Sequence, residues 1–171
     1  MTNRHPLRTI MSRCLLFMLA LSMPLAAQDT PRISELTPVD RQYMAAQRES
    51  VEDLARRHFG QGFTGARDHD LELLQRLLDQ RLVRPTQTEK LQAMGVILGD
   101  VLADELDMHW VIYQDRAGRS RALRYKKTDN YLFPVTMISR RQEAGSDTPV
   151  TAIYQKAVAA MEPVLEPLPY H

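Results

Sequence analysis

The chain has 171 residues, of which 44% are hydrophobic and 25% are charged, and its formal net charge is +1 at pH 7. A chain of this length can bury one ordinary core without covalent staples, so one domain is the natural expectation. Its single cysteine, Cys14, excludes a disulfide bond within the chain.

The first 27 residues have the three-part layout of a secretory signal peptide. An unbroken apolar run at 14–21 follows a stretch that carries basic residues and no acid, and small residues lie at 26–27. The basic residues are Arg4, Arg8 and Arg13. Because the run is shorter than the roughly 20 residues of a membrane-spanning helix, we expect cleavage near Ala27 and no membrane span afterwards. Met1 and Met11 are alternative starts that give the same mature chain.

Cleavage near Ala27 changes the composition of the mature chain. Loss of the three arginines lowers the count of Lys and Arg from 22 to 19 against 21 acids, so the net charge becomes −2. Cys14 leaves with the signal, and it precedes the apolar run rather than following it, which argues against lipid attachment. An exported chain without cysteine is expected in the bacterial periplasm or as a secreted protein.

The mature chain divides by composition into three parts. Residues 28–36 are polar and include a proline, so we expect a flexible lead. Residues 37–163 carry the periodic apolar patterns and are predicted to form one domain. Residues 164–171 are broken by prolines and are predicted to form an extended tail.

The domain is predicted to begin with a helix. Thr37 followed by Pro38 and Asp40 is typical of a helix N-terminus, because a hydroxyl can cap the first free N–H groups and proline suits the first helical position. Apolar residues then recur at helical spacing as far as Phe59, with Ser50 as an alternative second start.

Two further helices follow. Asp68 or Asp70 is predicted to cap a helix with a leucine stripe on its buried side. A third helix is predicted at 87–107, and in it Gly95 and Gly99 are spaced by four residues. Each glycine lowers helix stability by about 1 kcal/mol relative to alanine, so we expect them to permit close packing against a neighbouring element.

The pattern then changes to β-strands. Residues 109–115 are rich in aromatic and β-branched side chains and predict a first strand. Residues 120–126 and 131–139 are predicted to form a second and a third strand, and turn residues separate the three. Pro134 should place the third strand at a sheet edge or a bulge. A last helix is predicted around 153–161. The fold class is therefore α+β, with N-terminal helices, a three-stranded antiparallel meander and a closing C-terminal helix.

Four stretches of the chain resemble bacterial proteins of the domain-of-unknown-function 3806 family. They read ARRHFGQGF, DLELLQRLLD, LQAMGVILGDVLADELDMHWVIYQD and SRALRYKKTDNYLFPVTMISRR. The resemblance covers about 51–158, and its most specific part is a Leu-Gly-Asp helix that leads into a Trp-containing strand and then a Phe-Pro pair. The resemblance implies an α+β fold and transfers no catalytic residue, because the family has no established activity.

An acid/base site is one alternative suggested by the residues around the end of the third helix. Asp100 and Asp104 share a helix face at i, i+4 spacing, and His109 follows in the first strand. These residue types suit a hydrolase with a carboxylate/His site. A solvated helix face is the competing interpretation. The histidines lack metal-ligand spacing, so neither a metal nor another cofactor is predicted.

The charge distribution suggests a different site. Residues 116–141 contain eight basic residues and one acid, a net charge of +7, so the remainder of the mature chain carries −9. The candidate binding residues in this basic segment are Arg119, Arg121, Arg124, Lys126, Arg140 and Arg141. Such a surface could bind an anionic partner, or its arginines could pair internally with helix carboxylates.

Strand alternation refines this expectation. Leu123 and Tyr125 should face the core, so Arg124 and Lys126 should face outward, whereas Arg121 shares the inner side. Trp110 is expected to be a core side chain rather than a ligand platform.

Three hypotheses about function follow. The leading one is a non-catalytic binding or adaptor module in the bacterial envelope, whose partner is another envelope protein or an anionic envelope component. Nucleic acid is not expected as a partner of an exported protein. The alternatives are a hydrolase that uses the carboxylate/His site and an inhibitor or immunity-type protein.

Overall fold

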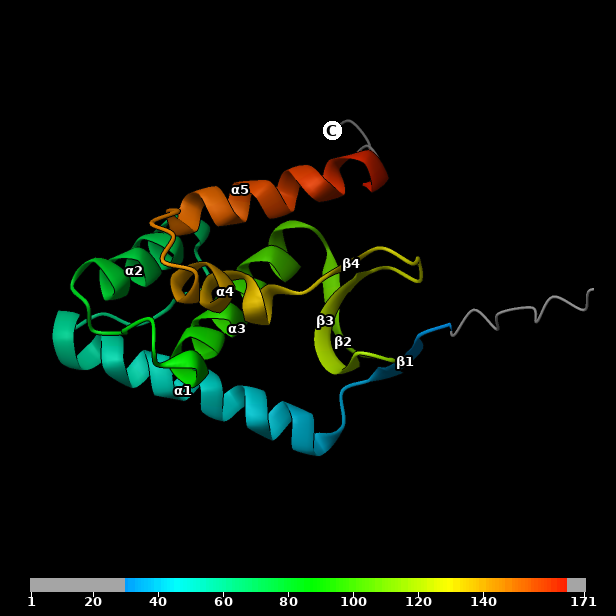
Figure 1. Ribbon diagram of the computed structural model, residues 1–171, viewed down its shortest axis with the longest axis horizontal. Coiled ribbons are helices and arrows are strands. Elements are labelled where there is room, and N and C mark those ends of the chain that lie inside the picture. The colour runs from blue at the N-terminus through cyan, green and yellow to red at the C-terminus, as the bar shows by residue number, and fades with distance from the viewer. Residues whose placement is uncertain (1–29, 166–171) are drawn as a thin grey trace, which may run out of the picture.

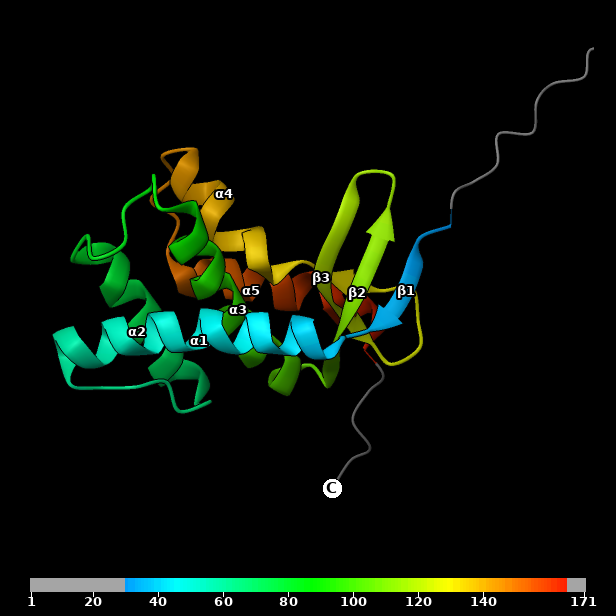
Figure 2. The same cartoon turned by 90° about the horizontal axis from the view of Figure 1, so that it is seen from below.

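The computed structural model describes residues 30–165 (Figures 1 and 2). The predicted signal peptide, Cys14 and most of the predicted tail lie outside the described residues. The elements are β1 Arg32–Glu35, α1 Pro38–Phe59, α2 Arg67–Asp79, α3 Thr88–Glu105, β2 Met108–Asp115, β3 Gly118–Tyr125, β4 Tyr131–Leu132, η1 Pro134–Thr136, α4 Met137–Glu143, α5 Val150–Met161 and η2 Glu162–Val164. The α+β class is confirmed, with the sheet at one end of a layer of helices (Figure 1).

Helix α1 begins where the sequence predicts. Thr37 Oγ1 accepts a hydrogen bond from the N–H of Asp40 at 3.2 Å, and the Asp40 carboxylate accepts one from the N–H of Thr37 at 3.1 Å. This reciprocal pair is a capping box that satisfies two otherwise free donors. The helix then runs unbroken for 22 residues. Ser50 is not a second start, because it lies within the helix and its hydroxyl donates to the carbonyl of Gln47.

Helix α2 begins differently from the expectation. Its N-cap is Ala66, which makes no capping bond through its side chain. Asp70 lies one turn inside the helix, and its carboxylate reaches back to accept hydrogen bonds from the N–H groups of Thr64 and Gly65, each at 2.9 Å. Asp70 therefore holds the preceding loop instead of capping the helix, and Asp68 is exposed.

Helix α3 lies at the centre of the molecule and contacts α1, α2, α4 and α5 as well as β2 and η1 (Figures 1 and 2). The predicted close packing at its glycines is confirmed. A Cβ atom on Gly95 would lie 2.7 Å from the carbonyl oxygen of Pro134. A Cβ atom on Gly99 would lie 2.6 Å from Cη2 of Trp110 and 2.7 Å from Cγ of Pro134.

One apolar core joins the helices to the sheet. It contains buried side chains from all five α-helices and from β2, β3 and β4, including Val51, Leu74, Leu98, Leu123 and Ile153. Leu123 and Tyr125 face this core, as alternation predicts. Within residues 30–165, no helix is long and apolar enough to cross a membrane.

The sheet has four antiparallel strands in the order β1-β2-β3-β4, one more than the predicted meander. The additional strand, β1, comes from the segment expected to be a flexible lead, and it pairs with β2 so that Ile33 lies opposite Tyr113. β2 pairs with β3 along its whole length, with Trp110 opposite Leu123. β1 is an edge strand of four residues, of which only Ile33 is partly buried.

The predicted third strand at 131–139 is wrong beyond Leu132. β4 contains two residues, which pair with Leu123 and Arg124, and the chain then turns into η1 and α4. Pro134 explains this change, because proline has no N–H group for a strand ladder and its fixed φ suits the first position of a helix. The short β4 leaves the first half of β3 without a strand on that side within the described residues.

Candidate functional site

Asp100 connects helix α3 to strand β2. The guanidinium of Arg48 donates two hydrogen bonds to its carboxylate, at 2.6 and 2.7 Å, and the Trp110 Nε1–H donates a third at 3.0 Å. Gly99 leaves room for the Trp110 ring, and Pro134 packs on the same glycine. Gly99 and Asp100 of the Leu-Gly-Asp helix therefore meet Trp110 of the strand and Pro134 of the Phe-Pro pair in one packing cluster, which is a structural reason for their occurring together.

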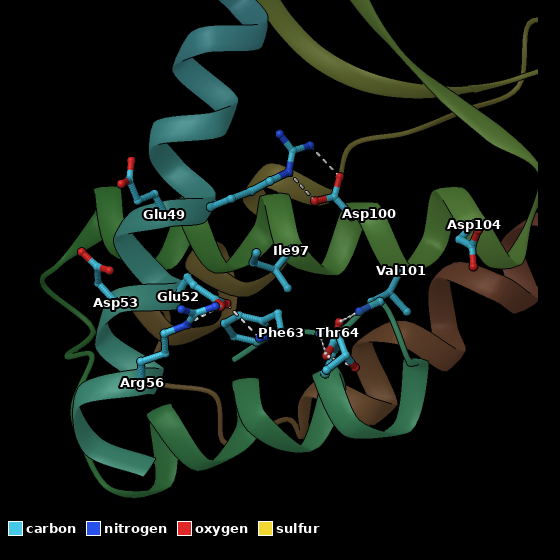
Figure 3. Close-up of a pocket in the computed structure, with 13 residues that line it drawn as sticks. Glu49, Glu52, Asp53, Arg56, Phe63, Thr64, Ile97, Asp100, Val101 and Asp104 are labelled. Atoms are coloured by element: carbon cyan, nitrogen blue, oxygen red, sulfur yellow. Dashed lines mark hydrogen bonds and ion pairs between the residues drawn. The ribbon is translucent and has the colours of Figure 1, made fainter. Parts of the chain in front are cut away.

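An open pocket of about 790 Å³ lies between α1, α3 and the loop before α2 (Figure 3). Its charged lining residues are Arg48, Glu49, Glu52, Asp53, Arg56, Asp70, Asp100 and Asp104. Several of these acids already have partners, since Glu52 binds Arg56 and the N–H of Phe63. Glu49 and Asp53 project from α1, away from Asp104 on α3 (Figure 3). The remaining carboxylates therefore do not converge on one point.

The alternative acid/base residues are not brought together. Asp100 and Asp104 line this pocket, but His109 does not, and it is exposed on β2. Alternation places His109 on the opposite face of the sheet from Trp110, which contacts Asp100. A general base must lie within hydrogen-bond reach of its partner, so these three residues do not form a catalytic unit in this geometry. Across residues 30–165, no cluster of three or more His, Cys, Asp or Glu side chains could hold a metal ion.

A second pocket, of about 590 Å³, lies at the start of β3. We call it the arginine–aromatic pocket, defined by Arg119, Arg121, Arg140, Tyr43, Tyr113 and Phe133. One wall is the β3 edge that β4 leaves uncovered, and the facing wall comes from η1 and α4. The remaining lining residues are Gln92, Asp115, Ala117, Ser120, Val135 and Thr136.

Two of the arginines are held in place by a buried carboxylate. Nη2 of Arg119 donates to Asp40 at 2.6 Å, and Nη2 of Arg121 donates to the other oxygen of Asp40 at 3.0 Å. The hydrogen bond from Arg119 is the main reason that the pKa of Asp40 lies well below its ordinary value, and the bonds from Thr37 act in the same direction against the effect of burial. The Arg121 guanidinium also stacks over the Tyr43 ring, 4.1 Å from its centroid.

The third arginine differs from the other two. Arg140 is exposed on α4, and its side chain makes no hydrogen bond or ion pair with the rest of the described chain. In the same lining, Tyr113 and Phe133 meet edge to face with ring centroids 5.2 Å apart, and Phe133 is 38% exposed. The pocket thus combines a free guanidinium with open aromatic surface.

The other basic residues of the segment lie elsewhere. Arg124 is on the opposite face of the sheet from Leu123, as predicted, but it donates to the carbonyls of Thr128 and Lys127 and so holds the β3–β4 turn. Lys126 lies at the end of β3 over the Tyr125 ring. Arg141 donates to the carbonyl of Met137. The six candidate residues therefore do not form one surface; three of them share the pocket.

The sequence pattern did not reveal the partners that complete this pocket. Asp40 was interpreted as a capping residue, and its second role as the acceptor for Arg119 and Arg121 depends on a contact between residues 79 positions apart or more. Tyr43 has helical spacing with the apolar residues of α1, but its side chain is 41% exposed. Strand alternation places Tyr113 on the opposite face of β2 from Trp110, and this position is the one signal in the sequence for an aromatic surface outside the core.

A comparison with protein-family models matches residues 70–154 to DUF3806, a domain of unknown function. The chain belongs to the DUF3806 family. The DUF3806 match includes Arg119, Arg121 and Arg140, whereas Asp40 and Tyr43 of α1 precede it. The pocket is therefore built from the family domain and from an N-terminal helix outside the match.

A comparison with solved structures supports the same fold. A crystal structure of a protein from Bacteroides thetaiotaomicron VPI-5482 superimposes with a TM-score of 0.68 at 18% identity. The match covers 78% of this DUF3806 chain and 49% of the other, so the chain spans about half of that protein's length. No curated protein matches the chain.

Proposed function

We propose that this protein is a non-catalytic binding module of the bacterial envelope and that the arginine–aromatic pocket is its binding site. The observation that carries the proposal is the convergence of Arg119, Arg121 and Arg140 on one open pocket with aromatic walls. The ligand is an anionic group attached to an apolar body, presented by an envelope protein or another envelope component.

The pocket has the properties that anion recognition needs. Arginine is the preferred side chain for planar, bidentate recognition of carboxylates and phosphates. Asp40 and the Tyr43 ring hold Arg119 and Arg121 in fixed positions, so little side-chain freedom is lost when a ligand binds. Arg140 adds a positive charge that has no partner of its own among the described residues.

The hydrogen bonds of Asp100 and the position of His109 also support binding better than hydrolysis. Asp100 accepts three hydrogen bonds that join α1, α3 and β2, which gives it a structural role. His109 lies outside the acid-lined pocket. A proton-transfer pair thus has no support from the geometry, whereas the arginine–aromatic pocket needs no such pair.

Export to the envelope rests on the signal-peptide layout of residues 1–27. We expect the product recovered from a bacterial periplasm to begin near Gln28 and to carry no lipid. Intact-mass measurement checks this expectation, and a mass that retains residues 1–27 would contradict it.

Titration with phenyl phosphate, which combines an anion with an aromatic ring, tests the proposed site. We expect amide resonances of 119–121 and 133–136 to shift in NMR spectra of the mature protein. Arg140→Glu should weaken binding about tenfold or more, because it replaces an attractive charge with a repulsive one. Raised salt should weaken binding to the unaltered protein.

Arg57→Glu is the matched control, since it makes the same charge change at an exposed position near the far end of α1. It should leave the affinity within about twofold, because screened charges more than roughly 10 Å apart interact weakly at ordinary ionic strength. Equal loss of binding in both variants, or shifts confined to other parts of the protein, would contradict a specific pocket.

A further inference from the structure

The edge of β3 that lines the arginine–aromatic pocket is open. β4 pairs with Leu123 and Arg124 only, so residues 118–122 have no strand partner on that side within the described chain. The N–H of Tyr125 donates toward β4, to the carbonyl of Asn130 at 3.1 Å. Because backbone groups of an antiparallel strand alternate in direction, those of Arg121 and Arg119 point to the same side. This edge therefore presents the backbone N–H and C=O groups of Arg119 and Arg121 to the pocket.

The pocket occupies the place where β4 would run if it continued. Leu132 lies opposite Leu123, so a longer β4 would pass beside Arg121 and Arg119 in turn. Instead, Pro134 diverts the chain, and Val135, Thr136 and Arg140 form the far wall of the space. A volume of about 590 Å³ falls in the range of roughly 300–1,000 Å³ typical of ligand sites.

We propose that the ligand of this pocket is an extended acidic peptide segment of a partner protein, which adds to β3 as an antiparallel strand in the place that β4 leaves open. This inference rests on the proposed function, because it assigns a ligand class to the same pocket. Main-chain hydrogen bonds to an exposed sheet edge provide affinity in this mode of recognition, and alternate side chains provide specificity.

The register predicts the side-chain pattern of the peptide. Peptide residues opposite Arg121 and Arg119 lie on the face that carries both guanidinium groups, so they should be acidic. The intervening residue, opposite Ser120, lies on the face of Tyr113, whose ring contacts Phe133, so it should be apolar. The expected pattern is acidic–apolar–acidic.

The charges of the pocket agree with this pattern. Arg119 and Arg121 each use one nitrogen to bind Asp40, which leaves other guanidinium N–H groups for a ligand, and Arg140 is free within the described chain. Asp115 is the acid in the lining, and it accepts hydrogen bonds from the turn N–H groups of Ala117 and Gly118. The lining residues together with Asp40 comprise three arginines and two acids, a net charge of +1. This positive charge favours an anionic ligand.

The probe for the experiment is a set of capped pentapeptides, Thr-Glu-Xaa-Glu-Thr, in which Xaa is each of the twenty amino acids. Fluorescence anisotropy with the labelled peptides and the mature protein should show binding that is strongest when Xaa is Val, Ile or Phe. Replacing both peptide glutamates by lysine, or using the Arg140→Glu protein, should reduce the affinity about tenfold or more.

N-methylation of the peptide distinguishes strand addition from anion binding alone. The N–H groups of the two glutamates face β3 in an antiparallel strand, so their methylation should weaken binding about tenfold or more. Methylation at Xaa, whose N–H faces away from β3, is the matched control and should change the affinity less than about threefold. Hydrogen exchange at the Arg119 and Arg121 amides should slow when the peptide binds but not when phenyl phosphate binds.

The two proposals fail in different ways. If both methylated peptides bind equally well, or if phenyl phosphate binds and no peptide does, strand addition is overturned and the anion site stands. If neither phenyl phosphate nor any peptide binds, the proposed function falls as well. Because the methylated peptides are tested on the unaltered protein, none of these outcomes depends on the folding of a variant.

Discussion

Asp40 shows how one side chain can both cap the start of a helix and hold two arginines of a distant strand. Its carboxylate completes the capping box with Thr37 and also receives Arg119 and Arg121 from β3. The side chain is only 3% exposed, so it needs these donors to remain ionised. The guanidinium groups thereby acquire fixed positions at the mouth of the arginine–aromatic pocket.

This arrangement predicts a specific pH dependence of stability. The folded-state pKa of Asp40 lies below its unfolded value near 3.9, chiefly because of Arg119, so its stabilisation is present above about pH 4. That stabilisation is lost as the pH falls toward the folded-state pKa. Asp40→Asn should lower the free energy of unfolding at pH 7 by roughly 2–4 kcal/mol, from lost capping and charge-assisted hydrogen bonds.

Urea unfolding at pH 7 and at pH 3 provides the measurement. The difference in stability between the two pH values should be smaller for Asp40→Asn than for the unaltered protein. Asp53→Asn, at an exposed position of the same helix, should keep most of the original difference. An unchanged pH dependence in Asp40→Asn would show that the carboxylate is not the acid-sensitive group.

At the scale of elements, the contact of α3 with β2 and η1 determines where the sheet lies. Gly99 is the point of closest approach, because a Cβ atom there would lie 2.6 Å from Cη2 of Trp110. In an unhindered helix, Gly→Ala stabilises by about 1 kcal/mol. Here we expect the opposite sign, with Gly99→Ala destabilising by about 1–3 kcal/mol through overpacking.

The fluorescence of Trp110, the one tryptophan of the chain, reports this change directly. Displacement of the indole should weaken its hydrogen bond to Asp100 and shift the emission maximum, and denaturant unfolding gives the stability. Glu89→Ala, in the exposed first turn of the same helix, should stay within about 0.5 kcal/mol. A stabilised Gly99→Ala protein would contradict the close approach.

The elements that the sequence predicts well are those with a local cause. Thr37 starts α1 through a contact three residues away, and the glycine spacing of α3 indicates a packed face before any partner is known. β1 was not predicted because it depends on a tertiary contact, whereas the end of β4 was missed although Pro134 is a local signal for it. Arg32–Glu35 becomes a strand by pairing with β2, and Pro134 ends β4 as it packs against α3.

The residues of the candidate site also differ in whether a local sequence pattern predicted them. The clustering of basic residues in the sequence identified Arg119, Arg121 and Arg140, but it also included Arg124, which holds a turn. The aromatic half of the pocket comes from α1, β2 and the residue before η1, and no local pattern links these three elements. The pocket itself exists because β4 is short, which the apolar composition of 131–139 does not indicate.

At the scale of the whole molecule, basic and acidic residues that are far apart in the sequence form ion pairs in the folded structure. The basic segment 116–141 reaches α1 through the contacts of Arg119 and Arg121 with Asp40, while Arg48 joins α1 to α3 through Asp100. The hypothesis of internal pairing therefore holds for Arg119 and Arg121, whereas the Arg140 side chain makes no hydrogen bond or ion pair within the described residues. Six acids of the remainder line the acid-lined pocket, together with Arg48 and Arg56.

The continuous apolar core should be sufficient to fold the mature chain without a metal or an oxidant. Its buried side chains join the helices and the sheet, and residues 28–171 contain no cysteine. A chain of about 144 residues buries roughly two thirds of its surface on folding, which makes covalent or metal staples unnecessary. We therefore expect the melting temperature of residues 28–171 to be unchanged by EDTA or by a thiol reductant. Magnesium-saturated EDTA controls for ionic strength. A fall in melting temperature of more than about 4 °C with free EDTA alone would indicate a structural metal. A fall of that size corresponds to a loss of about 1 kcal/mol in the free energy of unfolding.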